Sequence, residues 1–172
     1  AVSAVGNTID IDSAGNVTNG TTDGSTDLTA AIVDIVANIG IGSGIGNSSI
    51  FASSTSFTNL NTVTGGVYVT SLSVSDTTVD LSNATTSGDI VLSHTGTSLF
   101  TVTDSTATSG SLTINNTTSG GVTVGTVSSS GVLDIDSESG DLTVSTSATS
   151  GGSNVSLTTA TSGNIIIGAV SA

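Results

Sequence analysis

The chain contains no Lys and no Arg, while 13 Asp and Glu residues give it a formal net charge of −13. Nucleic-acid binding depends on Lys and Arg at the phosphates, so this composition excludes a nucleic-acid partner. The same lack excludes attraction to anionic lipid surfaces. Because only 8% of the residues are charged, the acidity favours solubility and an affinity for cations.

Cysteine, proline, methionine and tryptophan are also absent, so no disulfide can form. No apolar run of about 18 residues or more occurs, which excludes membrane insertion through a helix. Strong helix-forming residues are scarce. Leu28–Ala37 is the one helix candidate, but its β-branched residues suit a strand as well.

Ser and Thr make up more than a third of the chain, and short aliphatic runs alternate with them. From residue 65 onward a Gly-containing turn is followed by an alternating strand, as in Gly88–Leu92 (GDIVL) and Gly140–Val144 (GDLTV). This period of two places every second side chain in a core. The predicted core residues are Ile90, Leu92, Leu112, Ile114, Val122, Val124, Leu133, Ile135, Leu142, Val144, Val155, Leu157, Ile165 and Ile167.

Short strands every 8–12 residues or so fit a sandwich, a barrel or a solenoid. Repeated Ser-Gly turns and a small aliphatic inward set favour a solenoid, because similar corners indicate similar places in successive coils. We predict one all-β domain over 1–172, a parallel β-solenoid of about eight coils of ~20–22 residues. Residues 1–64 are less regular than 65–172. A β-sandwich or jelly-roll filament subunit is the alternative.

The two ends of the chain carry the same four residues, Ala1–Ala4 and Ala169–Ala172 (AVSA). Neither end shows the polar outer face of a solenoid cap. We therefore expect a segment of a longer array, or a filament subunit. Its partners would be copies of itself or adjacent repeats, paired end to end.

Several segments resemble the repeats of filamentous-haemagglutinin-like exoproteins: Ile39–Gly44 (IGIGSG), Ser49–Ala52 (SIFA), Thr62–Val69 (TVTGGVYV), Thr86–Leu92 (TSGDIVL) and Ser139–Val144 (SGDLTV). The resemblance covers most of residues 28–172. It implies a right-handed parallel β-helix in a large secreted or surface-anchored protein. Such proteins serve adhesion, biofilm cohesion or filament formation, and the complete lack of Lys and Arg departs from many of them.

Acidic residues occur in strand-like pairs, Asp10 with Asp12 and Asp134 with Asp136, and Asp141 follows at a turn. If the aliphatic residues between them point inward, the carboxylates point outward together. Carboxylate oxygens suit Ca²⁺, although the 12-residue calcium loop is missing. These five residues are calcium candidates, with a solvated acidic face as the alternative. We expect no other cofactor.

The residues that catalysis needs are not arranged for it. His94 is the only histidine, and we expect it on the surface. A Ser-His-Asp triad cannot be argued where Ser is everywhere, and no Arg, Lys or Trp is present to hold a sugar. We therefore predict no enzyme and no catalytic residue. Tyr68 should point outward, between two inward valines, where a partner could contact it.

Two further patterns concern the surface. Thr-x-Thr pairs at Thr62/Thr64, Thr101/Thr103 and Thr106/Thr108 leave an ice- or mineral-binding surface as an alternative. Asn-x-Ser/Thr sequences mark candidate glycosylation sites in exposed positions. These are Asn16, Asn19, Asn47, Asn83, Asn115, Asn116 and Asn154.

Taken together, the composition and the repeats predict a non-enzymatic structural module of an extracellular adhesin or filament. It would lie on a cell surface or in a secreted fibre, with host or matrix glycans as further partners. A pilin-like subunit joined by strand donation is the main rival. Functional amyloid is a weaker one, since strict identical repeats are absent.

Overall fold

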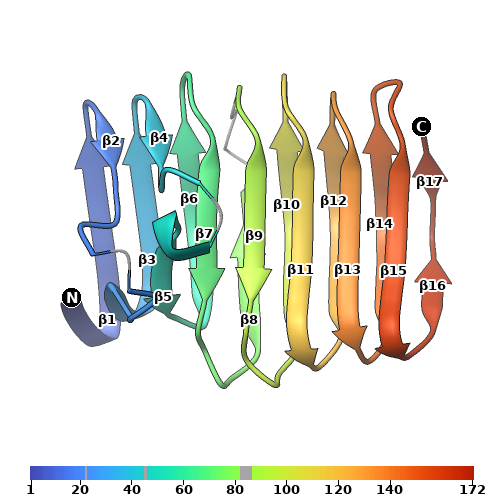
Figure 1. Ribbon diagram of the computed structural model, residues 1–172, viewed down its shortest axis with the longest axis horizontal. Helices are drawn as coiled ribbons and strands as arrows, with labels where there is room; N and C mark the ends of the chain where they lie inside the picture. Colours follow the sequence, from blue (N-terminus) through green and yellow to red (C-terminus); the bar gives the residue numbers. More distant parts are fainter. Residues whose placement is uncertain (22, 45, 82–86) are drawn as a thin grey trace.

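The computed structural model is a rod of stacked β-coils (Figure 1), and it describes residues 1–21, 23–44, 46–81 and 87–172. Every pairing between its named strands is parallel and joins strands of successive coils. The predicted parallel β-solenoid is confirmed, with about seven turns instead of about eight. The sandwich alternative is wrong, because a sandwich or jelly roll is built from antiparallel strands.

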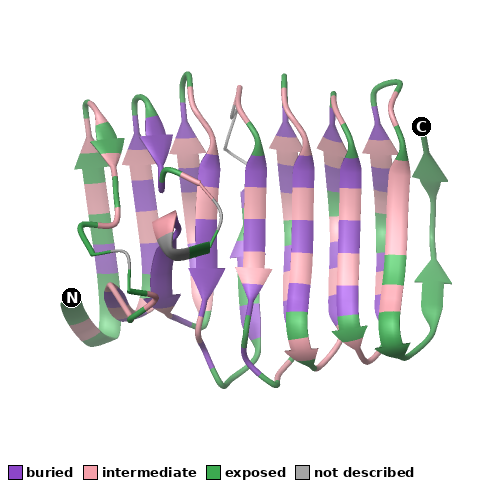
Figure 2. Cartoon of the chain, in the orientation of Figure 1, coloured by how far each residue is buried: buried purple, intermediate pink, exposed green. Residues whose placement is uncertain are grey.

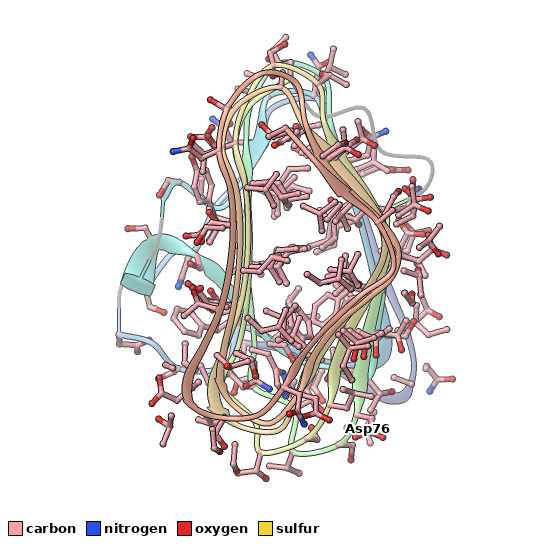
Figure 3. All side chains as sticks on the ribbon, turned by 90° about the vertical axis from the view of Figure 1, so that its right-hand side faces the viewer. Asp76 is labelled. Carbon is pink, nitrogen blue, oxygen red and sulfur yellow. The ribbon has the colours of Figure 1, made fainter. Side chains whose placement is uncertain are left out.

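The strands form two faces that enclose the core, with each coil passing once along either face (Figure 3). The first face consists of β1 (Val2–Ser13), β3 (Leu28–Ala37), β6 (Ser56–Thr62), β8 (Thr77–Asp80), β10 (Phe100–Ala107), β12 (Val122–Ser129), β14 (Leu142–Ser150), β16 (Ile165–Ile167) and β17 (Val170–Ser171). The second face consists of β2 (Asn16–Val17), β4 (Gly40–Ile41), β7 (Val67–Ser71), β9 (Ile90–His94), β11 (Leu112–Ser119), β13 (Leu133–Ser139) and β15 (Val155–Ser162). Between the faces, β5 (Ile50–Ser53) turns a corner and pairs with both β7 and β3.

Register fixes which side chains stack on one another. Val124 pairs with Val144, and Ile32 with Ser56, so a coil takes 20 to 24 residues at these places. The helix candidate Leu28–Ala37 is the strand β3. Its alternating buried side chains show why β-branched residues are used there, since they pack on a pleated surface.

The core consists of aliphatic columns that run along the rod between the two faces (Figures 2 and 3). Burial of each such side chain contributes roughly 1.5–3 kcal/mol. The predicted core residues of β9 to β14 are all buried: Ile90, Leu92, Leu112, Ile114, Val122, Val124, Leu133, Ile135, Leu142 and Val144.

The last coil departs from the predicted core. Val155 and Leu157 are only partly buried, although they pack against the core. Ile165 and Ile167 are 42% and 56% exposed, so the prediction is wrong for these two. Their strand, β16, lies on β14 with no described strand beyond it, which leaves one side of each side chain open.

Glycine lets the backbone of one coil approach the next at the corners. A Cβ atom at Gly110 would lie 2.5 Å from the carbonyl carbon of Gly88 in the preceding coil. Gly140 has a φ of +93°, and a Cβ atom there would lie 2.8 Å from the carbonyl carbon of Gly120. Only a residue without a side chain fits such places without displacing the backbone.

The second coil carries an insertion. Ile41 pairs with Val67 and Ile50 with Val69, so the segment between Ile41 and Ile50 stands opposite Tyr68 alone. This segment contains the 3₁₀ turn η1 (Gly46–Ser48), which projects outside the second face (Figure 3). The stacking of the coils continues on both sides of it.

Candidate functional site

Four carboxylates sit at corners, where each accepts a backbone N–H from the next coil. Phe51 N donates to Asp27 Oδ2 (3.0 Å), and Leu99 N donates to Asp76 Oδ1 (3.1 Å). Two more corners repeat this bond, from Ser111 N to Asp89 Oδ1 (2.9 Å) and from Asn164 N to Asp141 Oδ1 (2.8 Å). Charge-assisted bonds of this kind are stronger than neutral ones. These acids therefore hold successive coils together.

Other carboxylates lie on the outer side of the strands. Asp10 of β1 pairs with Asp34 of β3. Partial burial raises the pKa of Asp34, the nearby Asp10 and Asp12 add to the rise, and hydrogen bonds from Asn59 and Thr58 oppose it. The two acids are neighbours because the parallel register stacks identical positions of successive coils.

The pair on β13 behaves in the same way. Partial burial raises the pKa of Asp136, Asp134 adds a smaller rise, and a hydrogen bond with Thr158 lowers it. Both carboxylates point out of the second face, since Leu133 and Ile135 beside them are buried.

The five calcium candidates occupy three separate places: β1, β13 and a corner where Asp141 is engaged by both nitrogens of Asn164. Among the described residues, no three His, Cys, Asp or Glu side chains gather closely enough to hold a metal ion. A calcium site stays a prediction, which melting with and without a chelator would check.

One inward column of the second face is polar. Ser71, His94, Asn116 and Ser137 pair in register along β7, β9, β11 and β13, and each is at most 1% exposed. Asn116 Nδ2 donates to Ser98 O (3.2 Å) and Gly121 O (3.4 Å).

In the next coil of this column, Ser137 Oγ donates to Ser139 O (3.1 Å). The column thus satisfies backbone carbonyls that the turns direct inward, as buried polar groups require.

The expectation that His94 lies on the surface is wrong, because its side chain is 0% exposed. Its ring stacks on Phe100, with 5.2 Å between ring centres and 12° between planes. Its Nε2 lies 3.3 Å from Ser98 Oγ, and burial lowers its pKa below the usual value. Its position two residues after Leu92 would have indicated an inward direction, because strand alternation applies to polar residues too.

Hydroxyl groups form a column on the outer side of the first face. Thr78, Thr101, Thr123 and Thr143 pair in register on β8, β10, β12 and β14. Adjacent strands lie ~4.8 Å apart, which sets the spacing of these hydroxyls. Of the predicted Thr-x-Thr pairs, only Thr101/Thr103 starts in this column; Thr62 faces inward and is 1% exposed.

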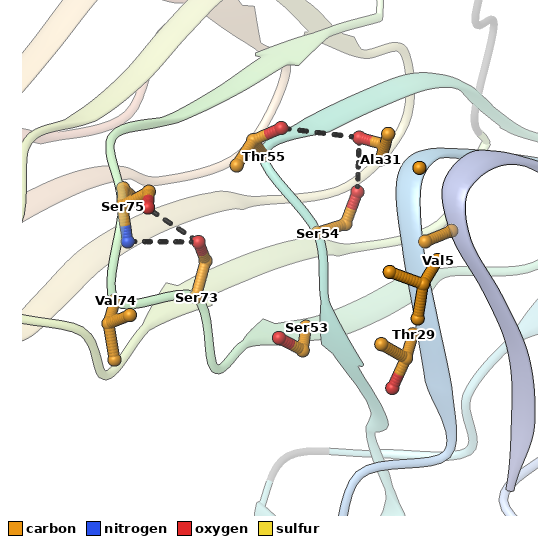
Figure 4. Close-up of a pocket in the computed structure, with 11 residues that line it drawn as sticks. Val5, Thr29, Ala31, Ser53, Ser54, Thr55, Ser73, Val74 and Ser75 are labelled. Atoms are coloured by element: carbon orange, nitrogen blue, oxygen red, sulfur yellow. Dashed lines mark hydrogen bonds between the residues drawn. The ribbon is translucent and has the colours of Figure 1, made fainter.

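A groove of about 320 Å³ runs across the corners of the first four coils (Figure 4). Its lining is neutral, and its hydroxyls bond to the backbone. Ser54 Oγ donates to Ala31 O (3.0 Å), and Ser75 N donates to Ser73 Oγ (3.2 Å). Val5 and Val74 also line the groove and are 73% and 83% exposed. The groove therefore offers apolar side chains beside hydroxyl and backbone groups.

The candidate glycosylation sites divide by exposure. Asn16 and Asn154 are exposed, whereas Asn19 and Asn115 are partly buried. Asn19 Nδ2 donates to Ser49 O (3.1 Å), which fixes the loop after β2. Asn116 is 1% exposed inside the polar column, so the folded chain does not present it to a transferase.

The remaining surface candidates can be stated briefly. Asn83 lies outside the described residues, as does the side chain of Asn47. Tyr68 lies between the buried Val67 and Val69 and is itself half-buried, facing outward as predicted. Partial burial raises its pKa, and Asp89 adds to the rise.

Comparison with protein-family models, with curated proteins and with solved structures finds no match for this chain. No helix among the described residues is long and apolar enough to cross a membrane. The arguments about function therefore come from the geometry of the coils, their ends and their outer surface.

Proposed function

We propose that this chain is a structural module of an extracellular adhesin or filament, without catalytic residues. The observation that supports it is the set of aliphatic columns that continues from coil to coil along the rod. One runs in register from Ile9 through Val33 and onward to Val144 and Ile167. About seven turns at ~4.8 Å each span ~34 Å. Such a rod serves as a stiff spacer.

The rod also offers two ends to further coils. Val2 of the first strand is 57% exposed, and Ile165, Ile167 and Val170 of the last coil are 39% to 56% exposed. Solenoids that end in solution need polar caps over such side chains. We propose that further coils stack on both ends, which makes the module part of a longer fibre at the cell surface or in a secreted filament.

The two faces differ in their number of strands, which bears on what stacks there. Among the described strands the first face has eight levels and the second face seven, counting β16 with β17 and β4 with β5 as one level each. A second copy placed directly on β16 and β17 would leave a gap one strand wide beside β15. A following repeat that begins with a second-face strand fills that gap. We therefore favour adjacent repeats over separate copies.

Two tandem constructions test this proposal. In the first, two copies of the 172-residue chain are joined directly. In the second, a duplicate of residues 131–140, which carries a second-face strand, is placed between them. We expect the second tandem to unfold as one rod with a higher melting temperature than the single chain, and to appear twice as long in electron micrographs.

Two outcomes would overturn the proposal. One is that both tandems melt at the temperature of the single chain. The other is a single chain that stays monomeric in mass photometry with both end coils protected from hydrogen exchange. The pilin-like alternative presupposes a sandwich that donates strands, and the parallel coils remove that basis.

For the adhesive contact itself, we propose the groove of Figure 4 as the place where host or matrix glycans bind. Its neutral lining of hydroxyl and backbone groups beside Val5 and Val74 supports a neutral sugar. Binding to a panel of neutral glycans should be lost in Val74→Arg and kept in Val132→Arg. Val132 is 41% exposed at a corner of another coil and does not line the groove. Equal binding by both variants would contradict the assignment.

The threonine column supports a second candidate function, binding to ice. Hydroxyl and methyl groups repeat there over four successive strands, at a constant spacing set by the sheet. Thermal hysteresis of the purified chain should disappear in Thr123→Lys and persist in Thr113→Lys, on the second face. Thr113 is flanked by buried Leu112 and Ile114, as Thr123 is by Val122 and Val124. No hysteresis in the unmodified chain would rule this candidate out.

A further inference from the structure

The only histidine of the chain is enclosed in the core of a solenoid whose other inward side chains cannot change charge near neutral pH. His94 occupies the polar column between Ser71 of β7 and Asn116 of β11. Its side chain is 0% exposed, in a position where the adjacent coils place an uncharged residue. A proton on this ring would be a charge inside the rod.

The surroundings of the ring suit its neutral form. Phe100 stacks on one side at 5.2 Å. Nε2 lies 3.3 Å from Ser98 Oγ, whereas Nδ1 has no hydrogen-bond partner among the described residues. The turn after β9 runs close over the ring, since a Cβ atom at Gly96 would lie 2.7 Å from Nε2. A protonated imidazole has two N–H donors, and here only one of them has a neighbour that can accept.

The charged groups near the ring provide little compensation. Ser71 and Asn116 above and below it are uncharged, as are Phe100 on β10 and Thr77 on β8. Asp76 is the carboxylate that favours the charged ring, yet burial outweighs it and the pKa of His94 is lowered. The Oδ1 atom of Asp76 accepts the backbone N–H of Leu99 at 3.1 Å, so this acid is held at the corner.

We propose that His94 makes one coil of the rod open in mild acid, through the corner formed by residues 71–77 and 94–100. Protonation places an unpaired charge in the core there and nowhere else, because the column is uncharged in the neighbouring coils. The stacked coils beyond this corner keep their contacts, since each coil of a solenoid contacts only its neighbours. This inference concerns the fold and does not depend on the proposed function.

The direction of the pH effect follows from linkage. In the opened state the pKa of the histidine returns to its usual value near 6.5, whereas in the closed state it is lower. Below pH 6.5 the opened state therefore binds more protons, and acid favours opening. The equilibrium constant for opening rises about tenfold for each pH unit below 6.5, until the closed state also takes up the proton. Above pH 6.5 the opening is independent of this group.

Hydrogen exchange read by mass spectrometry tests the proposal on the full chain, at about pH 7.5 and about pH 5, after correction for intrinsic exchange rates. Peptides over residues 71–77 and 94–100 should lose about 30-fold in protection at the lower pH. Peptides over 133–144 should change little. His94→Asn is the matched variant, because Asn116 occupies the same column position in the next coil. It should fold and lose the local pH effect.

A titration of the His94 ring by NMR complements the exchange data and needs no substitution. We expect its pKa below 6.5, and a value at or above 6.5 would overturn the proposal. Acid-induced loss of protection that is equal in all coils, or that persists unchanged in His94→Asn, would also overturn it. Either result would assign the acid response to the carboxylates instead.

Discussion

Residues 1–64 and residues 65–172 contribute to the same inward columns, but they build their corners differently. In the first region side chains hold the corners. Asn19 donates to Ser49 O, and Asp27 accepts from Phe51 N. In the second region glycines lie against the preceding coil, as Gly110 does on Gly88. The columns of Ile35 and Ile114 are equally buried in both regions. Strand register therefore fixes the core, whereas the corners can vary.

The insertion between β4 and β5 shows the consequence of this independence. It adds a loop with a 3₁₀ turn outside the second face, while Ile41 and Ile50 stay in their columns against Val67 and Val69. Surface loops tolerate added length at small entropic cost. New features can therefore be placed on the outside of this rod without changing its core.

The largest expected effect tests whether both regions share one core. Ile114→Ala and Ile35→Ala should each lower the free energy of unfolding by ~2–5 kcal/mol, because each removes a fully buried side chain. Ile167→Ala should change it by about 0.5 kcal/mol or less, since Ile167 is 56% exposed. Urea unfolding measures all three. A much smaller loss for Ile35→Ala than for Ile114→Ala would show that the first region packs loosely.

The next effect concerns the glycine corners. Gly110→Ala should cost ~1–3 kcal/mol, because the added Cβ atom would meet the backbone of the preceding coil at 2.5 Å. Gly15→Ala is the control in the first region, where no atom lies within 4 Å of such a Cβ. Thermal melting of both variants checks the difference. Equal melting temperatures would mean that the close approach at Gly110 relaxes freely.

A smaller effect is expected where the two regions use the same device. Asp89→Ala and Asp27→Ala each remove the acceptor of a backbone N–H from the next coil, and each should cost ~1 kcal/mol. Asp89→Asn keeps an acceptor oxygen and should lose less. If Asp89→Ala and Asp89→Asn melt at the same temperature as the unmodified chain, these bonds contribute nothing to holding the coils.

The sequence predicts the fold where alternation is undisturbed. Ile90, Leu112 and Leu133 follow Gly-containing turns at a steady spacing, so their stacking could be anticipated. The exposure of Ile167 could not, since alternation assigns a direction and not the number of coils that cover it.

The candidate sites were harder to predict than the core. The burial of His94 was predictable from its alternation with Leu92 but was overridden by its polarity. The pairing of Asp10 with Asp34 and the corner bond of Asp141 depend on contacts between coils more than 20 residues apart. Those contacts follow from register, and register requires the exact length of every corner, which composition does not give.

The smallest expected effect compares one outward carboxylate from each region. Partial burial raises the pKa of both Asp34 and Asp136 above 3.8, so each charged carboxylate is less stable in the folded chain than in the unfolded one. Asp34→Asn and Asp136→Asn should therefore raise the melting temperature slightly at pH 7, within the ~0.5 kcal/mol typical of surface changes.

The gain should shrink as the pH falls through the raised pKa values, because the folded chain then takes up the proton first. Below pH 3.8 the carboxylates are protonated in both states, and each variant should melt with the unmodified chain. Melting curves recorded between about pH 3 and pH 7 measure this. Lower stability of Asp34→Asn at pH 7 would show that its bond with Thr58 outweighs burial and the repulsion from Asp10 and Asp12. In that case the two regions would differ in how they hold outward charge, although their inward columns are alike.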